Sequence, residues 1–170
     1  MTRRIAIGGR PASGKSRLLA DMEKTGQVQV VKVDDLSSTI WKENGQALFH
    51  LLGLGPLPSR EIRRVFMAGG EDVEIVLSFL RDQTRKKIFE LFESPTHPIQ
   101  AVEFGGILWV PQDFKWDQEI WIYRDEEDRI RADLARENVK EGQGAPRTRE
   151  ESIAWADLCS PQENKWPFAL

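Results

Sequence analysis

Short apolar runs alternate along the chain with segments of helical periodicity. Residues 4–9 (RIAIGG) form an apolar run that ends in glycines, and residues 27–35 (QVQVVKVDD) alternate, become wholly apolar and end in two carboxylates. Residues 99–110 (IQAVEFGGILWV) and 118–123 (QEIWIY) are further apolar runs. Because parallel strands are buried on both faces, they are apolar along most of their length. We therefore expect four buried strands.

The segments between and after these runs carry apolar residues at helical spacing. In residues 71–94 the stripe is clearest, with charged residues such as Arg85 lying off it. Residues 139–148 contain glycine and proline and should form a loop, and residues 160–170 are read as irregular. The stripe in residues 71–94 consists of Val73, Val76, Leu77, Leu80, Ile88, Leu91 and Phe92. The segments expected to be helical are residues 13–26, 59–70, 71–94, 126–138 and 149–159.

Alternating strands and helices predict an α/β fold, with an open parallel sheet between two layers of helices. The length of 170 residues fits one domain spanning residues 1–170. Composition is that of an ordinary globular protein, with 40% apolar and 30% charged residues. No repeat or linker divides the chain.

The charge and cysteine content limit the partners and the compartment. A net charge of -3 argues against nucleic acid as a partner, so any basic site must be local. No apolar run reaches the roughly 20 residues that span a bilayer, which predicts no membrane partner. The lone Cys159 cannot form an internal disulfide, and the N-terminus lacks the apolar core of a signal peptide. We therefore expect a cytoplasmic protein, and the sequence leaves its oligomeric state open.

The first glycine-rich turn carries a candidate phosphate-binding motif. Residues 9–16 (GRPASGKS) match the pattern GxxxxGK[ST], and they follow the first strand and open the first helix. Such a loop binds phosphates through successive backbone N–H groups and the helix N-terminus. Lys15 would reach the β- and γ-phosphates of ATP, and the hydroxyl of Ser16 would hold Mg²⁺. The predicted nucleotide-binding residues here are Gly9, Arg10, Pro11, Ala12, Ser13, Gly14, Lys15, Ser16 and Arg17. The alternative is a surface turn with a solvated lysine.

Two carboxylates follow the second strand. In a parallel sheet, Asp34 and Asp35 would project at the carboxyl edge, where open α/β sheets bind ligands. We predict that Asp34 takes the proton from an attacking hydroxyl and that Asp35 assists at the substrate. The alternative is that Asp35 or Ser37 caps the next helix.

Arginines and one tryptophan complete the candidate site. In small-molecule kinases, arginines of a mobile lid neutralise charge on the transferred group, and we assign this role to Arg131 and Arg136. The same arginines could instead belong to a solvated helix face with ion pairs at i,i+4 spacing. Arg60, at a helix start that Ser59 is expected to cap, is a candidate clamp for an anionic substrate. Trp41 could form a wall of the substrate pocket.

The chain resembles the dephospho-CoA kinase family, which uses ATP to phosphorylate the ribose 3'-hydroxyl in the last step of coenzyme A biosynthesis. The matching stretches are IAIGGRPASGKS, VKVDDLSSTI, the segment from LLGLGPLPSREIRRVF into the long helix, and WDQEIWIYRDEEDRIRADLAREN. The resemblance implies that Asp34 is the base, that Arg136 contacts the nucleotide, and that Arg60 matches the family arginine. The segments EFGGIL and IYRDEEDRI are also similar to uridine kinase-like proteins.

Together these features predict a P-loop small-molecule kinase of the three-layer α/β/α class. A helical substrate-binding insertion is expected at about residues 36–93 and a lid at about residues 124–150. The cofactors would be ATP and Mg²⁺, and the partner a small-molecule acceptor, with Lys15, Asp34 and Arg136 as the catalytic residues. A uridine kinase-like nucleoside kinase is one alternative. A catalytically inactive ATP-binding module that docks a protein partner is another.

Overall fold

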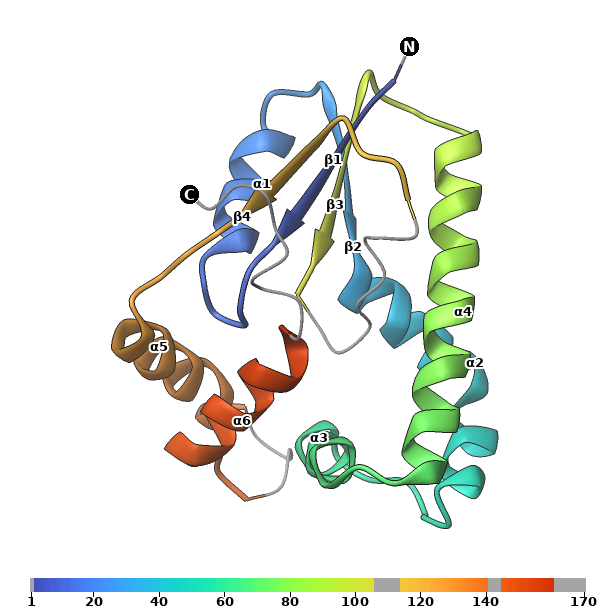
Figure 1. Ribbon diagram of the computed structural model, residues 1–170, viewed down its shortest axis with the longest axis vertical. Helices are drawn as coiled ribbons and strands as arrows, with labels where there is room; N and C mark the ends of the chain where they lie inside the picture. Colours follow the sequence, from blue (N-terminus) through green and yellow to red (C-terminus); the bar gives the residue numbers. More distant parts are fainter. Residues whose placement is uncertain (1, 106–113, 141–144, 161–170) are drawn as a thin grey trace.

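The computed structural model describes residues 2–105, 114–140 and 145–160. Within these ranges, four strands form a parallel sheet in the order β2-β3-β1-β4 (Figure 1). The central strand β1 pairs with β3 on one side and β4 on the other. All four strands point toward the same edge of the sheet, so the segments that follow them meet there. The strands are β1 (Arg3–Gly8), β2 (Val28–Lys32), β3 (Ile99–Phe104) and β4 (Gln118–Trp121).

The two faces of the sheet are covered by different helices. On one face, Ile5, Ile7 and Ala101 of the sheet pack with Leu19 of α1 (Lys15–Glu23). On the other face, alternate strand residues such as Ala6 and Val102 pack with residues of α2 (Val33–Leu51) and α4 (Glu71–Glu93). The alternation of inward residues along each strand thus produces a core on each side of the sheet.

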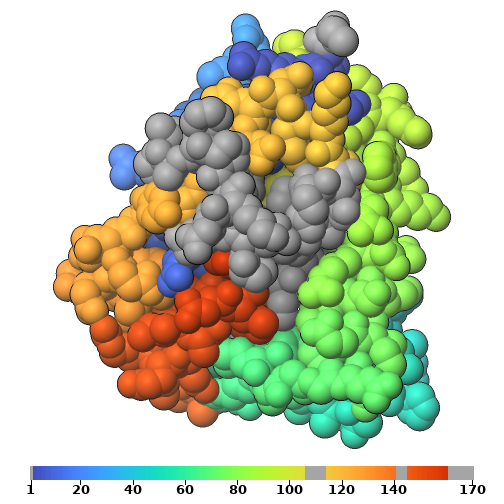
Figure 2. Space-filling model, in the orientation of Figure 1, coloured from blue at the N-terminus to red at the C-terminus, as the bar shows by residue number. Residues whose placement is uncertain are grey.

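Three further helices lie beyond the carboxyl edge of the sheet. They are α3 (Ser59–Ala68), α5 (Glu126–Asn138) and α6 (Arg149–Cys159), and they face the arrowheads of the strands in Figure 1. Figure 2 shows α5 beside α6, with α3 next to α6, in agreement with the contacts between these pairs. Asp125 caps α5, and a capping box formed by Thr148 and Glu151 starts α6. These helices therefore enclose the space into which the strands point.

The α/β/α fold class and the parallel sheet are confirmed. The stripe predicted for residues 71–94 is also confirmed, since Val73, Val76, Leu77, Leu80, Ile88 and Phe92 are buried. The third strand is found from Ile99 to Phe104, and the remainder of its expected range, apart from Gly105, lies outside the described residues.

Two local expectations were wrong. The second strand ends at Lys32 rather than at residue 35, and α2 begins at once, so the two carboxylates that follow the strand, Asp34 and Asp35, lie in the first turn of a helix. Carboxylates are favourable there because they face the positive end of the helix dipole. Ser59 does not cap α3 but is its first residue, since Pro58 holds the cap position and no side chain caps it. Likewise no side chain caps α2, whose cap position is Lys32, so neither Asp35 nor Ser37 has that role.

None of the helices in the described ranges combines the length and the apolar character needed to cross a bilayer.

Candidate functional site

The loop between β1 and α1 has the backbone of a phosphate cradle. Gly9 and Gly14 have φ values of 149° and 106°, and Ala12 lies in the left-handed region with φ 63°. A Cβ at Gly9 would lie 2.7 Å from both the Oγ of Ser13 and the carbonyl oxygen of Ile122, so only glycine fits. The loop then leads directly into the N-terminus of α1. Backbone N–H groups and the positive end of a helix are thereby available to an anion.

Lys15 lies in this loop and is only 5% exposed. Its ammonium group donates to the carbonyl oxygens of Gly9, at 2.8 Å, and Arg10, at 3.0 Å. Burial lowers the pKa of Lys15, while the nearby carboxylates of Glu103 and Asp34 act in the opposite direction. Lys15 is therefore a desolvated cation held by its own loop and flanked by two acids.

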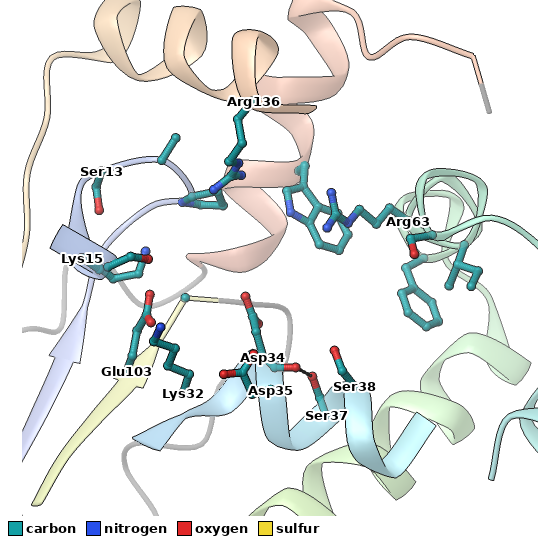
Figure 3. A pocket seen from close by; sticks show the side chains of 18 of the residues that line it. Ser13, Lys15, Lys32, Asp34, Asp35, Ser37, Ser38, Arg63, Glu103 and Arg136 are labelled. Atoms are coloured by element: carbon teal, nitrogen blue, oxygen red, sulfur yellow. Dashed lines mark hydrogen bonds between the residues drawn. The ribbon is translucent and has the colours of Figure 1, made fainter. Parts of the chain in front are cut away.

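A cavity of about 820 Å³ opens in front of the loop. Asp34 and Asp35 line it from the first turn of α2, and Trp41 lines it from the same helix. Figure 3 shows Asp34 between Lys15 on one side and Arg63 of α3 on the other. The structure thus brings the predicted base, the phosphate-binding lysine and Trp41 to one cavity.

The cavity also contains an acid that sequence reasoning missed, Glu103 at the end of β3. It lines the cavity beside Lys15, and burial raises the pKa of its carboxyl while Lys15 opposes that rise. The side chain of Lys15 passes close to Gly105, just beyond Glu103, since a Cβ there would lie 2.6 Å from Cε of Lys15. The signal in the sequence was a single charge inside the apolar run AVEF. A carboxylate near the end of a parallel strand falls at the ligand-binding edge.

The arginines of α5 divide into two groups. Arg136 lines the cavity, and its guanidinium is held by the buried carboxylate of Asp133 at 2.8 Å. Arg131 does not line the cavity; it is exposed and pairs with Asp128 at 3.3 Å. Of the two predicted lid arginines, only Arg136 is therefore placed at the site. For Arg131 the alternative of a solvated helix face describes its position, although its partner lies at i−3 rather than i,i+4.

Arg60 is buried and is not among the residues that line the cavity, so the structure does not bring this predicted substrate clamp to the site. Its guanidinium donates to the carbonyl oxygens of Glu137, of Ala145 at 2.9 Å and of Lys140 at 3.4 Å. Those carbonyls lie at and beyond the C-terminal end of α5, where the i+4 donors of the helix interior are missing. Arg60 therefore joins α3 to the end of α5. Arg63, one turn further along α3, is the arginine of that helix that lines the cavity.

Arginines in and just before the first turn of α5 contact backbone carbonyls of the phosphate loop. Arg124, which also lines the cavity, donates to the carbonyl oxygen of Ala12 at 3.1 Å. The fully buried Arg129 pairs with Glu126 at 2.7 Å, and its guanidinium lies 3.5 Å from the carbonyl oxygen of Pro11. The side chain of Arg10 turns outward to Glu126, at 3.3 Å, and to Asp157 of α6, at 3.1 Å.

The loop fits a polyphosphate with its metal ion. The Oγ of Ser13 is buried and has no hydrogen-bond partner among the described residues, which suits a donor to phosphate. Ser16 lines the cavity and offers a hydroxyl. No cluster of three or more His, Cys, Asp or Glu side chains suited to a metal occurs in the described ranges. A metal ion bound here would take most of its ligands from phosphate and water, as Mg²⁺ does. Arg17 lies outside this cavity, on a smaller adjoining hollow that Ser13, Gly14 and Arg124 also line.

Comparisons with known proteins agree on the fold. No family model matches the sequence, and no curated protein matches it. Among solved structures, the TT1252 protein of Thermus thermophilus superposes with a TM-score of 0.72 at 19% identity, covering 99% of this chain and 87% of that one. Dephospho-CoA kinase from Campylobacter jejuni gives a TM-score of 0.59 at 17% identity over 100% and 88% of the two chains. Shikimate kinase from Bacteroides thetaiotaomicron gives 0.54 at 12% identity over 100% and 86%. The chain therefore has a dephospho-CoA kinase-like P-loop kinase fold.

Proposed function

We propose that the protein is a small-molecule kinase that transfers the γ-phosphoryl group of ATP to a hydroxyl group. The observation that carries this proposal is the meeting of Lys15, Asp34 and Arg136 at one cavity, two cations and an acid contributed by three different helices. Phosphoryl transfer needs positioned cations for the transferred group and an acceptor for the proton of the hydroxyl. This combination has no evident use in a solvated surface turn.

Each residue has a distinct role in this reaction. The backbone N–H groups of residues 10–16 bind the triphosphate, and Lys15 leaves the carbonyl oxygens of its own loop to contact the β- and γ-phosphates. Asp34 accepts the proton of the attacking hydroxyl. Arg136, held in place by Asp133, neutralises charge on the transferred group. The hydroxyl of Ser16 would hold Mg²⁺, which would supply positive charge to stabilise the phosphates.

Glu103 adds an acid close to the lysine in this scheme. A desolvated lysine loses its proton more easily, and a neighbouring carboxylate favours the charged form. We assign to Glu103 the maintenance of a charged Lys15 until the triphosphate replaces that partner.

Two further segments of the chain supply the acceptor wall and a lid in this proposal. Residues 36–93 supply the acceptor wall through α2 and α3, including Trp41 and Arg63. Residues 124–150 would act as a lid, since they carry Arg124 and Arg136 into the cavity from one side. Arg124, just before α5, would then link the lid to the phosphate loop through its hydrogen bond to the carbonyl oxygen of Ala12. We place this reaction in the cytoplasm, where ATP is abundant.

The proposed acceptor is dephospho-CoA, phosphorylated on its ribose 3'-hydroxyl. Two observations support it: the sequence resemblance in the phosphate loop and at Asp34, and the fold match to a protein described as a dephospho-CoA kinase. The cavity of about 820 Å³ has room for such a substrate next to the loop.

Coupled measurement of ADP release with purified protein tests the proposal. ATP, Mg²⁺ and dephospho-CoA should give steady turnover, and uridine or adenosine should give less. Turnover with uridine alone would replace dephospho-CoA by a nucleoside as the acceptor. Tight binding of ATP without turnover for any acceptor would instead identify an inactive ATP-binding module. The Asp34→Asn variant separates true transfer from a contaminating kinase, because it should remove the turnover.

A further inference from the structure

Arg63 lies across the cavity from the phosphate loop and has no role in the phosphoryl-transfer chemistry described above. Figure 3 shows its side chain reaching from α3 toward the cavity, on the far side of Asp34 from Lys15. Its side chain is 29% exposed, so the guanidinium remains open to the cavity. It lies at the end where the acceptor molecule would extend beyond its reacting hydroxyl.

Two neighbours hold the Arg63 guanidinium in one orientation. Its Nη1 donates to Oε2 of Glu137 at 2.7 Å, and its guanidinium carbon lies 5.5 Å from the centre of the Trp155 ring. Glu137 is buried, so this hydrogen bond is protected from water. An arginine fixed by a carboxylate and an aromatic ring retains donors for a further anion at little additional cost in side-chain entropy.

The carboxylate of Glu137 is shared, which leaves this end of the cavity positively charged. Besides Arg63, it pairs with Lys140 at 2.8 Å and with Arg136 at 3.2 Å. Arg136 also pairs with Asp133, which holds Arg147 as well, so four cations share two carboxylates here. This surplus of positive charge attracts an anion from solution more strongly than a one-to-one ion pair would.

The charges lining the whole cavity point the same way. Among the described residues, six cationic side chains and three anionic ones line it, although the protein has a net charge of -3. The anionic side chains are Asp34, Asp35 and Glu103, and the charges of all three act on one another next to the phosphate loop. Arg63 lines the cavity on the far side of Asp34 from Lys15, toward the acceptor end. The cationic side chains are Lys15, Lys32, Lys42, Arg63, Arg124 and Arg136.

Apolar side chains border Arg63 and give the acceptor end a mixed character. Ile62, Phe66 and Trp155 line the cavity there, with Trp41 packed edge-on against Phe66 at 6.0 Å between ring centres. A ligand at this end would place apolar atoms against the rings and an anionic group against the guanidinium.

We propose that Arg63 binds an anionic group of the acceptor, so that the substrate class is an alcohol bearing a phosphate, diphosphate or carboxylate group rather than a neutral nucleoside. The proposal rests on the kinase function proposed above and specifies its acceptor. In this proposal the anion is bound by Arg63 and not by Arg60, whose guanidinium donates to backbone carbonyl oxygens.

The test compares Arg63→Gln with Arg85→Gln, the same change at an arginine of α4 that pairs with Asp82 and does not line the cavity. Arg63→Gln should raise the KM for dephospho-CoA about tenfold to a hundredfold, the value of one or more charge-assisted hydrogen bonds. The kcat and the KM for ATP should change less than about twofold, since Arg63 does not contact the transferred group. Arg85→Gln should match the wild type.

Binding measurements make the test independent of turnover. Calorimetric titration of the ADP- and Mg²⁺-saturated protein with dephospho-CoA, shikimate and adenosine presents a diphosphate, a carboxylate and a neutral ribose. Preference for either anionic compound, lost in Arg63→Gln, supports the proposal and identifies the anion. Arg63→Lys, which keeps the charge without the planar fork, should bind with intermediate affinity and controls for misfolding of the glutamine variant.

The possible failures are distinguishable. If the wild type phosphorylates an acceptor but Arg63→Gln leaves every KM and affinity unchanged, the role of Arg63 is wrong while the kinase function stands. If the wild type binds dephospho-CoA through Arg63 without turnover, the kinase function fails and the anion site stands. Preference for adenosine over both anions, or binding of none of the three compounds, overturns the anion site.

Discussion

The two ends of the cavity are built in different ways. The proposed phosphate end is one continuous segment, residues 9–16, which would bind its ligand mostly through backbone N–H groups. The acceptor end is assembled from separate helices, with Trp41 on α2, Arg63 on α3 and Trp155 on α6. One end depends on local backbone geometry, whereas the other depends on how distant helices pack.

This difference determines which side-chain substitutions each end of the cavity tolerates. A phosphate cradle made of backbone survives most side-chain changes outside its glycines and lysine, because the N–H groups remain. An acceptor wall made of side chains changes its specificity with each substitution. The four experiments below, from the largest expected effect to the smallest, test whether the two ends behave as this division requires.

Lys15→Ala should produce the largest loss. Removing the cation that contacts the transferred group should reduce kcat about 10³-fold or more and should weaken ATP binding as well. Steady-state kinetics and nucleotide titration measure the two effects. An alanine variant that retained both would show that the loop is a solvated turn, and the division between the ends would lose its basis.

Asp34→Asn should affect the chemistry but not the nucleotide. Replacing a general base by its amide should reduce kcat on the order of 10²-fold to 10³-fold. The affinity for ATP should stay nearly unchanged, because the backbone cradle is intact. Parallel measurement of kcat and ATP affinity tests whether the variant loses the chemical step and keeps nucleotide binding. Unchanged turnover would exclude Asp34 as the base and would direct attention to Asp35 or Glu103.

Asp133→Asn tests the packing on which the acceptor end depends. The buried carboxylate of Asp133 accepts from Arg136 at 2.8 Å, from Arg147 at 2.7 Å and from Ser152 at 2.8 Å. Removing its charge leaves a buried guanidinium without compensation, which should lower the free energy of unfolding by about 3 kcal/mol. Urea denaturation measures this value.

The matched control for Asp133 is Asp128→Asn on the same helix. Asp128 pairs with Arg131 on the exposed face, where ion pairs contribute little. Its unfolding midpoint should therefore equal that of the wild type. Equal destabilisation by the two variants would mean that the interior pair has no special role in holding α5 to α6.

Acid should loosen the acceptor end through Glu137. Burial would raise the pKa of Glu137, but the hydrogen bond from Lys140 and the charges of Arg63 and Arg136 outweigh it and lower the pKa to about 2. A depressed pKa stabilises the folded state above the unfolded pKa of 4.5 and loses that contribution as pH falls toward 2. Between pH 5.5 and 2.5 the loss should be about 2 kcal/mol.

Denaturation of the wild type and of Glu137→Gln across that pH range measures this contribution. The variant should show a flatter dependence of unfolding free energy on pH, because it lacks the titrating group. Identical slopes in the two proteins would assign the acid sensitivity to other carboxylates.

The accuracy of prediction followed the same division. The phosphate loop was predicted from one contiguous motif, since its glycines and lysine are adjacent in the chain and the flanking strand and helix are evident from periodicity. The end of the second strand was expected at residue 35 instead of Lys32, because a strand and a helix that join without a turn leave no boundary residue to read. Glu103 was missed because a single charge in an apolar run has no periodic signal.

By itself, the sequence determined the α/β class, the four strands and the phosphate loop, because these follow from local periodicity and from a motif of adjacent residues. It also predicted the helices other than α2, whose range of Val33–Leu51 came only from the structure. The tertiary structure alone decided that Arg60 donates to backbone carbonyls near the end of α5 and that Arg63 lines the cavity. Both arginines lie in α3 and are chemically the same residue, so the sequence does not distinguish their roles. Which of them meets backbone carbonyls and which meets the cavity depends on the position of α5, whose residues lie far along the chain.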